Sequence, residues 1–193
     1  HDHRPEITRS GRLPGATITL YVNGAEVTGV GTRITVQNNG TWSYTPTTGW
    51  PDANYDIAYT VSDTNGNVSN QSPKLNFKID TVAPIGGTVS IDTPIAGDGV
   101  VDTGEAGTNI PVTGTVTIPV DAVTTTVTVT VNGQDYLATV NPLTGTWTAT
   151  IPGSQFAKAA GDVHVKAIFT DTAGNASLPA VGDEPYRLNI PAL

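Results

Sequence analysis

Carboxylates in short, turn-like segments are the residues of this sequence best suited to chemistry. Asp63 and Asp171 each begin an Asp-x-x-Gly-Asn segment, and one loop spaces Asp98, Asp102 and Glu105 as Asp-x-x-x-Asp-x-x-Glu. Such segments suit Ca²⁺, which takes about six to eight oxygen ligands. The same segments are also typical of plain turns and of a solvated acidic loop, because an Asp side chain hydrogen-bonds to nearby backbone without a metal. Both interpretations stay open at this point.

The overall charge is acidic and unevenly distributed. The 193 residues carry 17 acids and 9 bases, a net charge of −8. Residues 1–80 hold 7 acids and 6 bases, whereas residues 81–193 hold 10 acids and 3 bases. An acidic chain without a basic cluster argues against nucleic acid as a partner. No apolar run approaches the ~20 residues of a membrane helix, so we expect no membrane insertion.

No residue constellation predicts catalysis. The chain has no cysteine, which removes disulfides, thiolate metal sites and a cysteine nucleophile. The one histidine outside the N-terminus, His164, alternates with apolar residues beside Lys166, so we expect it on a polar strand face. Because no nucleophile elbow accompanies it, we expect the protein not to be an enzyme.

The sequence contains an internal duplication. Three markers recur in the same order: Gly40-Thr41-Trp42 at 145–147, Asp63 to Ser69 at 171–177, and Val22-Asn23-Gly24 at 131–133. The offsets are 105, 108 and 109 residues, which indicates two units of similar build. Each unit has the size of a small sandwich domain.

Both units have the pattern of β-strands. Apolar and polar residues alternate before Asp63 and before Asp171, and the composition is rich in Thr, Val and Gly. Turn residues every 8–12 positions are typical of an immunoglobulin-like sandwich. We therefore predict an all-β chain of two tandem immunoglobulin-like domains joined end to end. The expected bounds are 1–80, a short linker at 81–83, and 84–193 with an acidic loop at 93–107.

Three expectations concern smaller features. Trp42 and Trp147 follow matching turns and should anchor the two cores. Trp50 has no counterpart and is expected to be partly exposed, where Tyr21 or Tyr186 could extend an aromatic patch for a glycan. Only residues 154–160 are expected to hold a helical turn.

In order along the chain, four segments resemble bacterial Ig-like repeats of giant, biofilm-associated surface adhesins, many of them exported by type I secretion. These segments are 14–20, 40–42, 63–67 and 79–84, and residues 97–107 are similar to a related subtype. The resemblance implies an extracellular stalk module that binds Ca²⁺ at or near domain junctions. Two departures stand out: Pro191 replaces the acid equivalent to Asp80, and Ala173 replaces the Asn found at Asn65.

The topology of an immunoglobulin-like sandwich then suggests where the acids lie. Asp171 should point back toward the first domain and meet Asp80, which leaves that domain, while Asp63 faces the opposite end. The loop with Asp98, Asp102 and Glu105 lies at the far end of the second domain if it joins the first two strands. It folds onto the junction if the first strand is displaced, and the sequence leaves both open.

The function that we expect is that of a spacer in a large bacterial adhesin. Its partners would be adjacent Ig-like repeats of the same chain, and the chain would be a monomer at the cell surface. Two alternatives stay open. One is a binding module that contacts a glycan or protein on a host or neighbouring cell, and the other is an accessory domain of a secreted enzyme.

Overall fold

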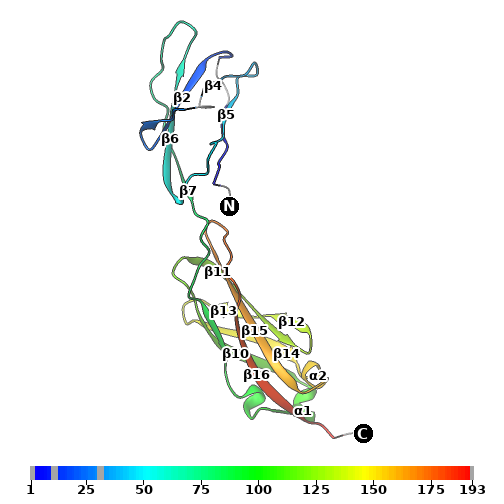
Figure 1. The fold of residues 1–193 in the computed structure, drawn as a ribbon. Helices are drawn as coiled ribbons and strands as arrows, with labels where there is room; N and C mark the ends of the chain where they lie inside the picture. The colour runs from blue at the N-terminus through cyan, green and yellow to red at the C-terminus, as the bar shows by residue number, and fades with distance from the viewer. Residues whose placement is uncertain (1–2, 10–12, 30–32, 192–193) are drawn as a thin grey trace. The chain divides into compact units, whose positions relative to one another are not determined.

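The computed structural model describes residues 3–9, 13–29 and 33–191 of the chain (Figure 1). The backbone divides into two compact units, His1–Thr81 and Val82–Leu193, which we call unit 1 and unit 2 and describe separately. Both are built of strands, as the alternating pattern predicts. Among the described residues, no helix combines the length and the apolar character that spanning a bilayer requires.

Unit 1 has a short two-stranded sheet and a larger second sheet. The first sheet pairs β1 with β5, and the second has the order β3-β2-β6-β7, with β4 also on β2. All of these pairs are antiparallel. The strands are β1 (Ile7–Arg9), β2 (Thr17–Val22), β3 (Ala25–Glu26), β4 (Ile34–Thr35), β5 (Trp42–Tyr44), β6 (Ala53–Ser62) and β7 (Leu75–Ile79).

Unit 2 is a more complete sandwich of two sheets. Their orders are β13-β14-β10-β8 and β12-β11-β15-β16-β9, and only the β9–β16 pair is parallel. The elements are β8 (Thr88–Ile91), η1 (Ile95–Gly97), β9 (Val100–Asp102), α1 (Thr103–Ala106), β10 (Asn109–Thr117), β11 (Ala122–Val131), β12 (Gln134–Leu137), β13 (Thr139–Asn141), β14 (Thr146–Pro152), α2 (Gly153–Phe156), β15 (Gly161–Asp171) and β16 (Ala180–Asn189).

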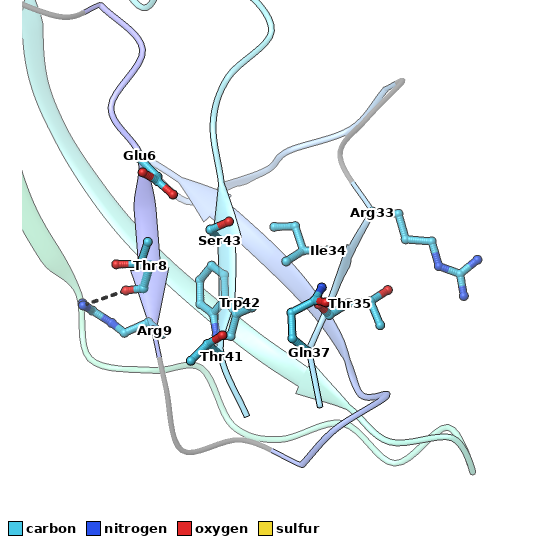
Figure 2. Close-up of a pocket in the computed structure, with 10 residues that line it drawn as sticks. All are labelled: Glu6, Thr8, Arg9, Arg33, Ile34, Thr35, Gln37, Thr41, Trp42 and Ser43. Carbon is cyan, nitrogen blue, oxygen red and sulfur yellow. Dashed lines mark hydrogen bonds between the residues drawn. The ribbon is translucent and has the colours of Figure 1, made fainter. Parts of the chain in front are cut away.

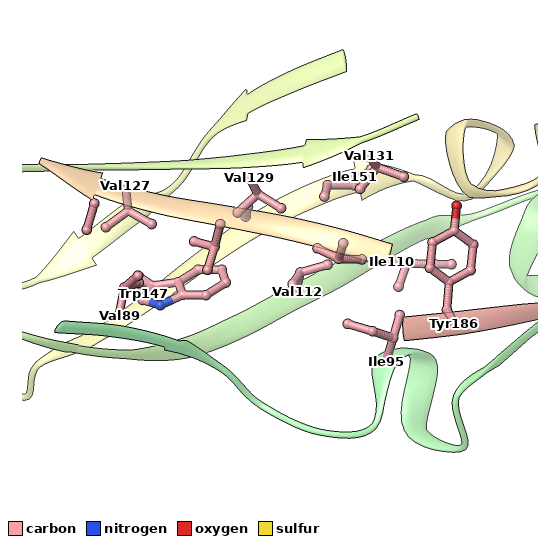
Figure 3. Packing of buried hydrophobic residues seen from close by; sticks show 14 of the residues in the cluster. Val89, Ile95, Ile110, Val112, Val127, Val129, Val131, Trp147, Ile151 and Tyr186 are labelled. Carbon is pink, nitrogen blue, oxygen red and sulfur yellow. The ribbon is translucent and has the colours of Figure 1, made fainter. Parts of the chain in front are cut away.

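The core of unit 2 follows the alternation in the sequence. Val127, Val129 and Val131 on β11 are fully buried, and every second residue of β15 from Val163 to Phe169 is buried with them. Trp147 is 1% exposed and lies among these valines between the sheets (Figure 3). The prediction that Trp147 is a core anchor is therefore confirmed, and its apolar area stabilises the sandwich.

The core of unit 1 contains Trp42, 2% exposed, as predicted. Trp50, in contrast, is only partly buried, as expected. Its ring lies 5.0 Å from the ring of Tyr55 and 6.2 Å from that of Phe77, and it packs against the core of unit 1. In unit 2, Tyr186 is 3% exposed and donates its hydroxyl to Ala159 O. The buried Tyr186 therefore cannot extend an exposed aromatic patch, whereas glycan stacking on the partly exposed Trp50 stays a prediction.

The short helices were only partly foreseen. The expected helical turn within 154–160 overlaps α2. A second turn, α1, forms inside the acidic loop, and η1 precedes it. The prediction of a single helical turn was wrong because it overlooked the capping signal carried by Asp102 and Glu105.

Candidate calcium sites

Asp63 organises the turn after β6 through its own side chain. Its Oδ1 accepts hydrogen bonds from the backbone N–H groups of Asn65 at 2.9 Å and Asn67 at 2.8 Å, and its Oδ2 accepts from Asn67 Nδ2 at 2.7 Å. The side-chain hydrogen bond from Asn67 is the main cause that lowers the pKa of Asp63. The carboxylate is therefore ionised and already engaged by the turn.

Asp171 repeats this arrangement after β15, but it is buried, at 6% exposure. Its Oδ1 accepts from Asn175 N and its Oδ2 from Asn175 Nδ2, both at 2.8 Å. Burial raises the pKa of Asp171, yet the hydrogen bonds from Asn175 and neighbouring backbone outweigh burial and lower it overall. The plain-turn interpretation thus accounts for the conformations of both Asp63 and Asp171 without a metal.

Asp80 follows β7 at the end of unit 1. Its Oδ2 accepts a hydrogen bond from Lys78 Nζ at 2.7 Å, so a cation of the chain already faces this carboxylate. The predicted pairing of Asp80 with Asp171 joins residues of different units and stays a prediction.

A second acid near this chain end was not foreseen from the sequence. Asp52 Oδ2 accepts from the Thr81 backbone N–H at 2.9 Å, and its Oδ1 accepts from the Thr81 hydroxyl at 3.0 Å. The backbone hydrogen bond from Thr81 is the main cause that lowers the pKa of Asp52. The contact spans 29 residues, and no local spacing signals it. It fixes the last residue of unit 1 to the start of β6.

The acidic loop joins β8 to β10 and lies at one end of unit 2. Asp102 pairs with Asn189 near the end of β16, and α1 packs against α2 there (Figure 1). Asp171 lies at the opposite end, beyond the Ala167–Ala180 pair, where Asn175 contacts Val82. Of the two open alternatives, the structure therefore supports the far end of unit 2 for this loop.

Within the loop, the three predicted acids make local hydrogen bonds. Asp98 Oδ1 accepts from Val100 N at 2.9 Å, while Asp102 and Glu105 cap α1 reciprocally. Glu105 also lines a pocket with Asp92. Among the described residues, no group of three or more acidic or histidine side chains is close enough to hold a metal ion. Ca²⁺ binding would need backbone or water oxygens beside these carboxylates.

One pocket of unit 1 and one histidine of unit 2 lie outside the predicted carboxylate sites. One pocket of unit 1 surrounds Trp42 and is lined largely by hydroxyl and amide side chains, with Glu6 as its one carboxylate (Figure 2). On unit 2, His164 lies on the exposed face of β15 as predicted and pairs with Asp183 of β16. No nucleophile accompanies this pair among the described contacts.

A family match agrees with this architecture. Residues 1–81 match the family model described as bacterial Ig-like domain. Unit 1 is therefore similar to bacterial Ig-like domains, as the resemblance of its motifs suggested. No curated protein matches the sequence.

Two solved structures of adhesins resemble nearly the whole chain. One is a Ca²⁺-stabilized adhesin that helps an Antarctic bacterium reach out and bind ice; it is 27% identical over 95% of this chain and 43% of its own, with a TM-score of 0.63. The other is a 1.5-MDa bacterial ice-binding adhesin, 27% identical over 98% of this chain and 59% of its own, with a TM-score of 0.62. The chain thus spans less than two thirds of either structure, and it is similar to an adhesin module.

Proposed function

We propose that this chain is a non-enzymatic spacer of a large extracellular bacterial adhesin, stiffened by Ca²⁺. The observation that carries the proposal is the similarity of nearly the entire chain to two adhesin structures, one of them described as Ca²⁺-stabilized. A chain of repeated sandwich units suits a mechanical role.

In the proposed mechanism, carboxylate side chains bind Ca²⁺ ions. Asp80 and Asp171 would share a junction ion, Asp63 would serve the opposite end of unit 1, and Asp98, Asp102 and Glu105 would bind an ion in the acidic loop. Bound Ca²⁺ supplies positive charge that offsets the repulsion between the acids. If its free concentration is ~100-fold above Kd, binding adds about 2.7 kcal/mol to the free energy of unfolding.

The chemistry of the donors supports this assignment. Carboxylate oxygens are hard ligands that suit Ca²⁺, and unit 2 carries most of the excess acid. The Asp102–Glu105 pair also holds its loop in one conformation before any ion arrives, which lowers the entropy lost on binding. The lowered pKa values keep Asp63 and Asp171 ionised at neutral pH.

The proposal also covers the cellular location of the protein and its partners. The chain would act as a monomer on the bacterial surface, exported by type I secretion, with neighbouring Ig-like repeats of the same polypeptide as its partners and biofilm formation as its context. Because Tyr186 is buried and the partly exposed Trp50 packs against Tyr55, the aromatic argument gives the glycan-binding alternative less support than the spacer has.

Thermal unfolding in millimolar Ca²⁺, in millimolar Mg²⁺ and in EDTA tests whether Ca²⁺ stabilises the chain. We expect a rise of several degrees with Ca²⁺ alone, since about 1 kcal/mol shifts the midpoint of a domain this size by about 4–8 °C. An equal midpoint in all three conditions would contradict calcium stabilisation and leave a plain spacer.

X-ray scattering with and without Ca²⁺ tests the junction. We expect a longer maximum dimension with Ca²⁺ in the native chain, and this change should vanish in Asp80→Asn. The matched control is Asp56→Asn, which removes an exposed carboxylate of unit 1 that faces Lys74 at 3.7 Å. If Asp80→Asn and the native chain lengthen equally, Asp80 is not a junction ligand.

A further inference from the structure

The pocket around Trp42 on unit 1 has a polar lining (Figure 2). Its volume is about 790 Å³, within the range of about 300–1,000 Å³ that is usual for ligand pockets. Thr8, Thr41 and Ser43 contribute hydroxyl groups to the lining, and Gln37 contributes a side-chain amide, so we call it the hydroxyl pocket. These groups both donate and accept hydrogen bonds, and the pocket therefore suits a ligand that carries hydroxyl groups of its own.

Two arginines flank the hydroxyl pocket. Arg9 and Arg33 both line it, and they lie on opposite sides of Trp42 in Figure 2. Among the described residues, no salt bridge joins either guanidinium to a carboxylate. The two lysines of unit 1, in contrast, each face an acid, at 3.7 Å for Lys74 and at 2.7 Å for Lys78. A guanidinium without a carboxylate presents a planar fork of donors to an acidic group of a ligand.

The corresponding surface of unit 2 has the opposite character. Strand pairing puts Gly114 of β10 at the position that Arg9 has on β1. Beside it, the Thr113 hydroxyl donates to Asp92 Oδ2 at 2.7 Å, so a carboxylate lies where unit 1 has its pocket. Because the two units share this strand pairing, the fold itself does not require a basic pocket. Its presence in unit 1 therefore points to a ligand.

Glu6 narrows the class of ligand. It is the one carboxylate among the described lining residues, and a carboxylate repels a polyanion whose charges are closely spaced. Instead it accepts hydrogen bonds from hydroxyl groups. Trp42 is 2% exposed, so polar contacts rather than aromatic stacking must supply the affinity. The lining thus fits a ligand with many hydroxyl groups and a few well-separated acidic groups.

We propose that the hydroxyl pocket binds an acidic polysaccharide, whose sugars carry carboxylate or sulfate groups. Arg9 and Arg33 pair with acidic groups on different sugars of the ligand. The hydroxyl and amide side chains between them pair with ring hydroxyl groups, and Glu6 accepts from one of these hydroxyls. This binding uses no metal ion, so it goes beyond the spacer role and stands apart from the calcium mechanism.

An NMR titration of the full chain in EDTA tests the pocket, since EDTA prevents Ca²⁺ from bridging acids of the protein and the ligand. The probes are oligogalacturonate and dextran sulfate, and methyl-esterified oligogalacturonate is the neutral control. The signals are the side-chain amide of Gln37 and the indole N–H of Trp42, with the Trp147 indole as the internal reference. We expect the Gln37 and Trp42 signals to move saturably with an acidic probe and not with the neutral control.

Variants that each remove one positive charge locate the binding site. Arg9→Gln and Arg33→Gln should each weaken binding by about tenfold, as expected for the loss of one charge-assisted hydrogen bond. Both side chains are exposed, so the thermal midpoint should stay that of the native chain. The matched control is Lys74→Gln, which removes an exposed base of unit 1 outside the pocket and should leave the affinity nearly unchanged.

The outcomes decide the proposal in both directions. Saturable binding that the two arginine variants weaken and Lys74→Gln does not supports it, and the probe that binds identifies carboxylate or sulfate as the acidic group. Unmoved signals with both acidic probes overturn it, as does equal binding of the neutral control. Equal weakening by all three variants also overturns it, because the charge of unit 1 as a whole would then attract the probe. Signals that move with protein concentration alone would assign the pocket to a second copy and overturn it too.

Discussion

Asp102 and Glu105 hold each other at the start of α1. Asp102 Oδ1 accepts from the Glu105 backbone N–H at 2.9 Å, and Glu105 Oε2 accepts from the Asp102 backbone N–H at 3.0 Å. This reciprocal pair is a capping box, and its Asp-x-x-Glu spacing was visible in the sequence. Two acids that look like calcium ligands thus have a structural role of their own, which substitutions can separate from metal binding.

Asp102→Asn should preserve the cap and remove the charge, because Asn caps helices about as well as Asp. We expect unit 2 in EDTA to keep its midpoint, while calorimetric titration loses one Ca²⁺-binding event if the loop binds metal. Asp102→Ala should lower the free energy of unfolding by about 1 kcal/mol even in EDTA, since the cap is gone. An unchanged Ca²⁺ stoichiometry in Asp102→Asn would remove this loop from the metal sites.

Acid should destabilise both units through Asp63 and Asp171. Their pKa values are lowered in the folded chain, so the stability that they contribute is complete above the unfolded value of about 3.9. That contribution is lost as pH falls through the folded pKa, because protonation weakens the turn hydrogen bonds. Thermal midpoints recorded from neutral pH to about pH 2 should fall most steeply below about pH 4.

A matched pair of variants isolates the contribution of Asp171. Asp171→Asn should flatten the acid dependence of unit 2, because the group that titrates differently in the two states has been removed. Asp162→Asn removes an exposed carboxylate of β15 and should leave the slope nearly unchanged. Equal slopes in the native chain and Asp171→Asn would show that the turn hydrogen bonds do not set the acid sensitivity.

Alternation along the strands was enough to predict the sandwich cores. Val127, Val129 and Val131 are buried because side chains alternate between the two faces of a strand, and the pattern depends only on local sequence. Matching Gly-Thr-Trp turns likewise placed Trp42 and Trp147. Most of the fold could therefore be predicted from the local periodicity of the sequence.

Contacts between residues that are far apart in the sequence could not be predicted from local periodicity. Asp52 binds Thr81 across 29 residues, and Trp50 contacts Phe77, which lies on β7 beside β6. An isolated acid or aromatic has no spacing that reveals its partner. The candidate metal residues were predictable as turn and loop acids, whereas their hydrogen-bond partners emerged only from the folded chain.

Replacing each core tryptophan by phenylalanine should destabilise the two units unequally. Trp147→Phe loses two hydrogen bonds and leaves Ser90 O and Thr115 O without this donor, so we expect about 1–3 kcal/mol beyond the packing loss. Trp42→Phe removes a buried donor that has no partner among the described residues, so we expect only the packing loss. Denaturant unfolding followed by NMR signals of each unit measures both. Equal losses would contradict the absence of a partner for Trp42.

The close approach of β8 to β10 makes Gly114 hard to replace. A Cβ there would lie 2.0 Å from Ser90 O and 2.5 Å from the Trp147 ring, so backbone and core must both move. We expect Gly114→Ala to lower the free energy of unfolding by about 1–3 kcal/mol, the usual range for overpacking. Gly161→Ala is the matched control, since no heavy atom lies within 4 Å of a Cβ at that position. A Gly114→Ala chain as stable as the control would mean that β8 can shift without a loss of stability. In that case β8 would contribute little to the stability of the sandwich.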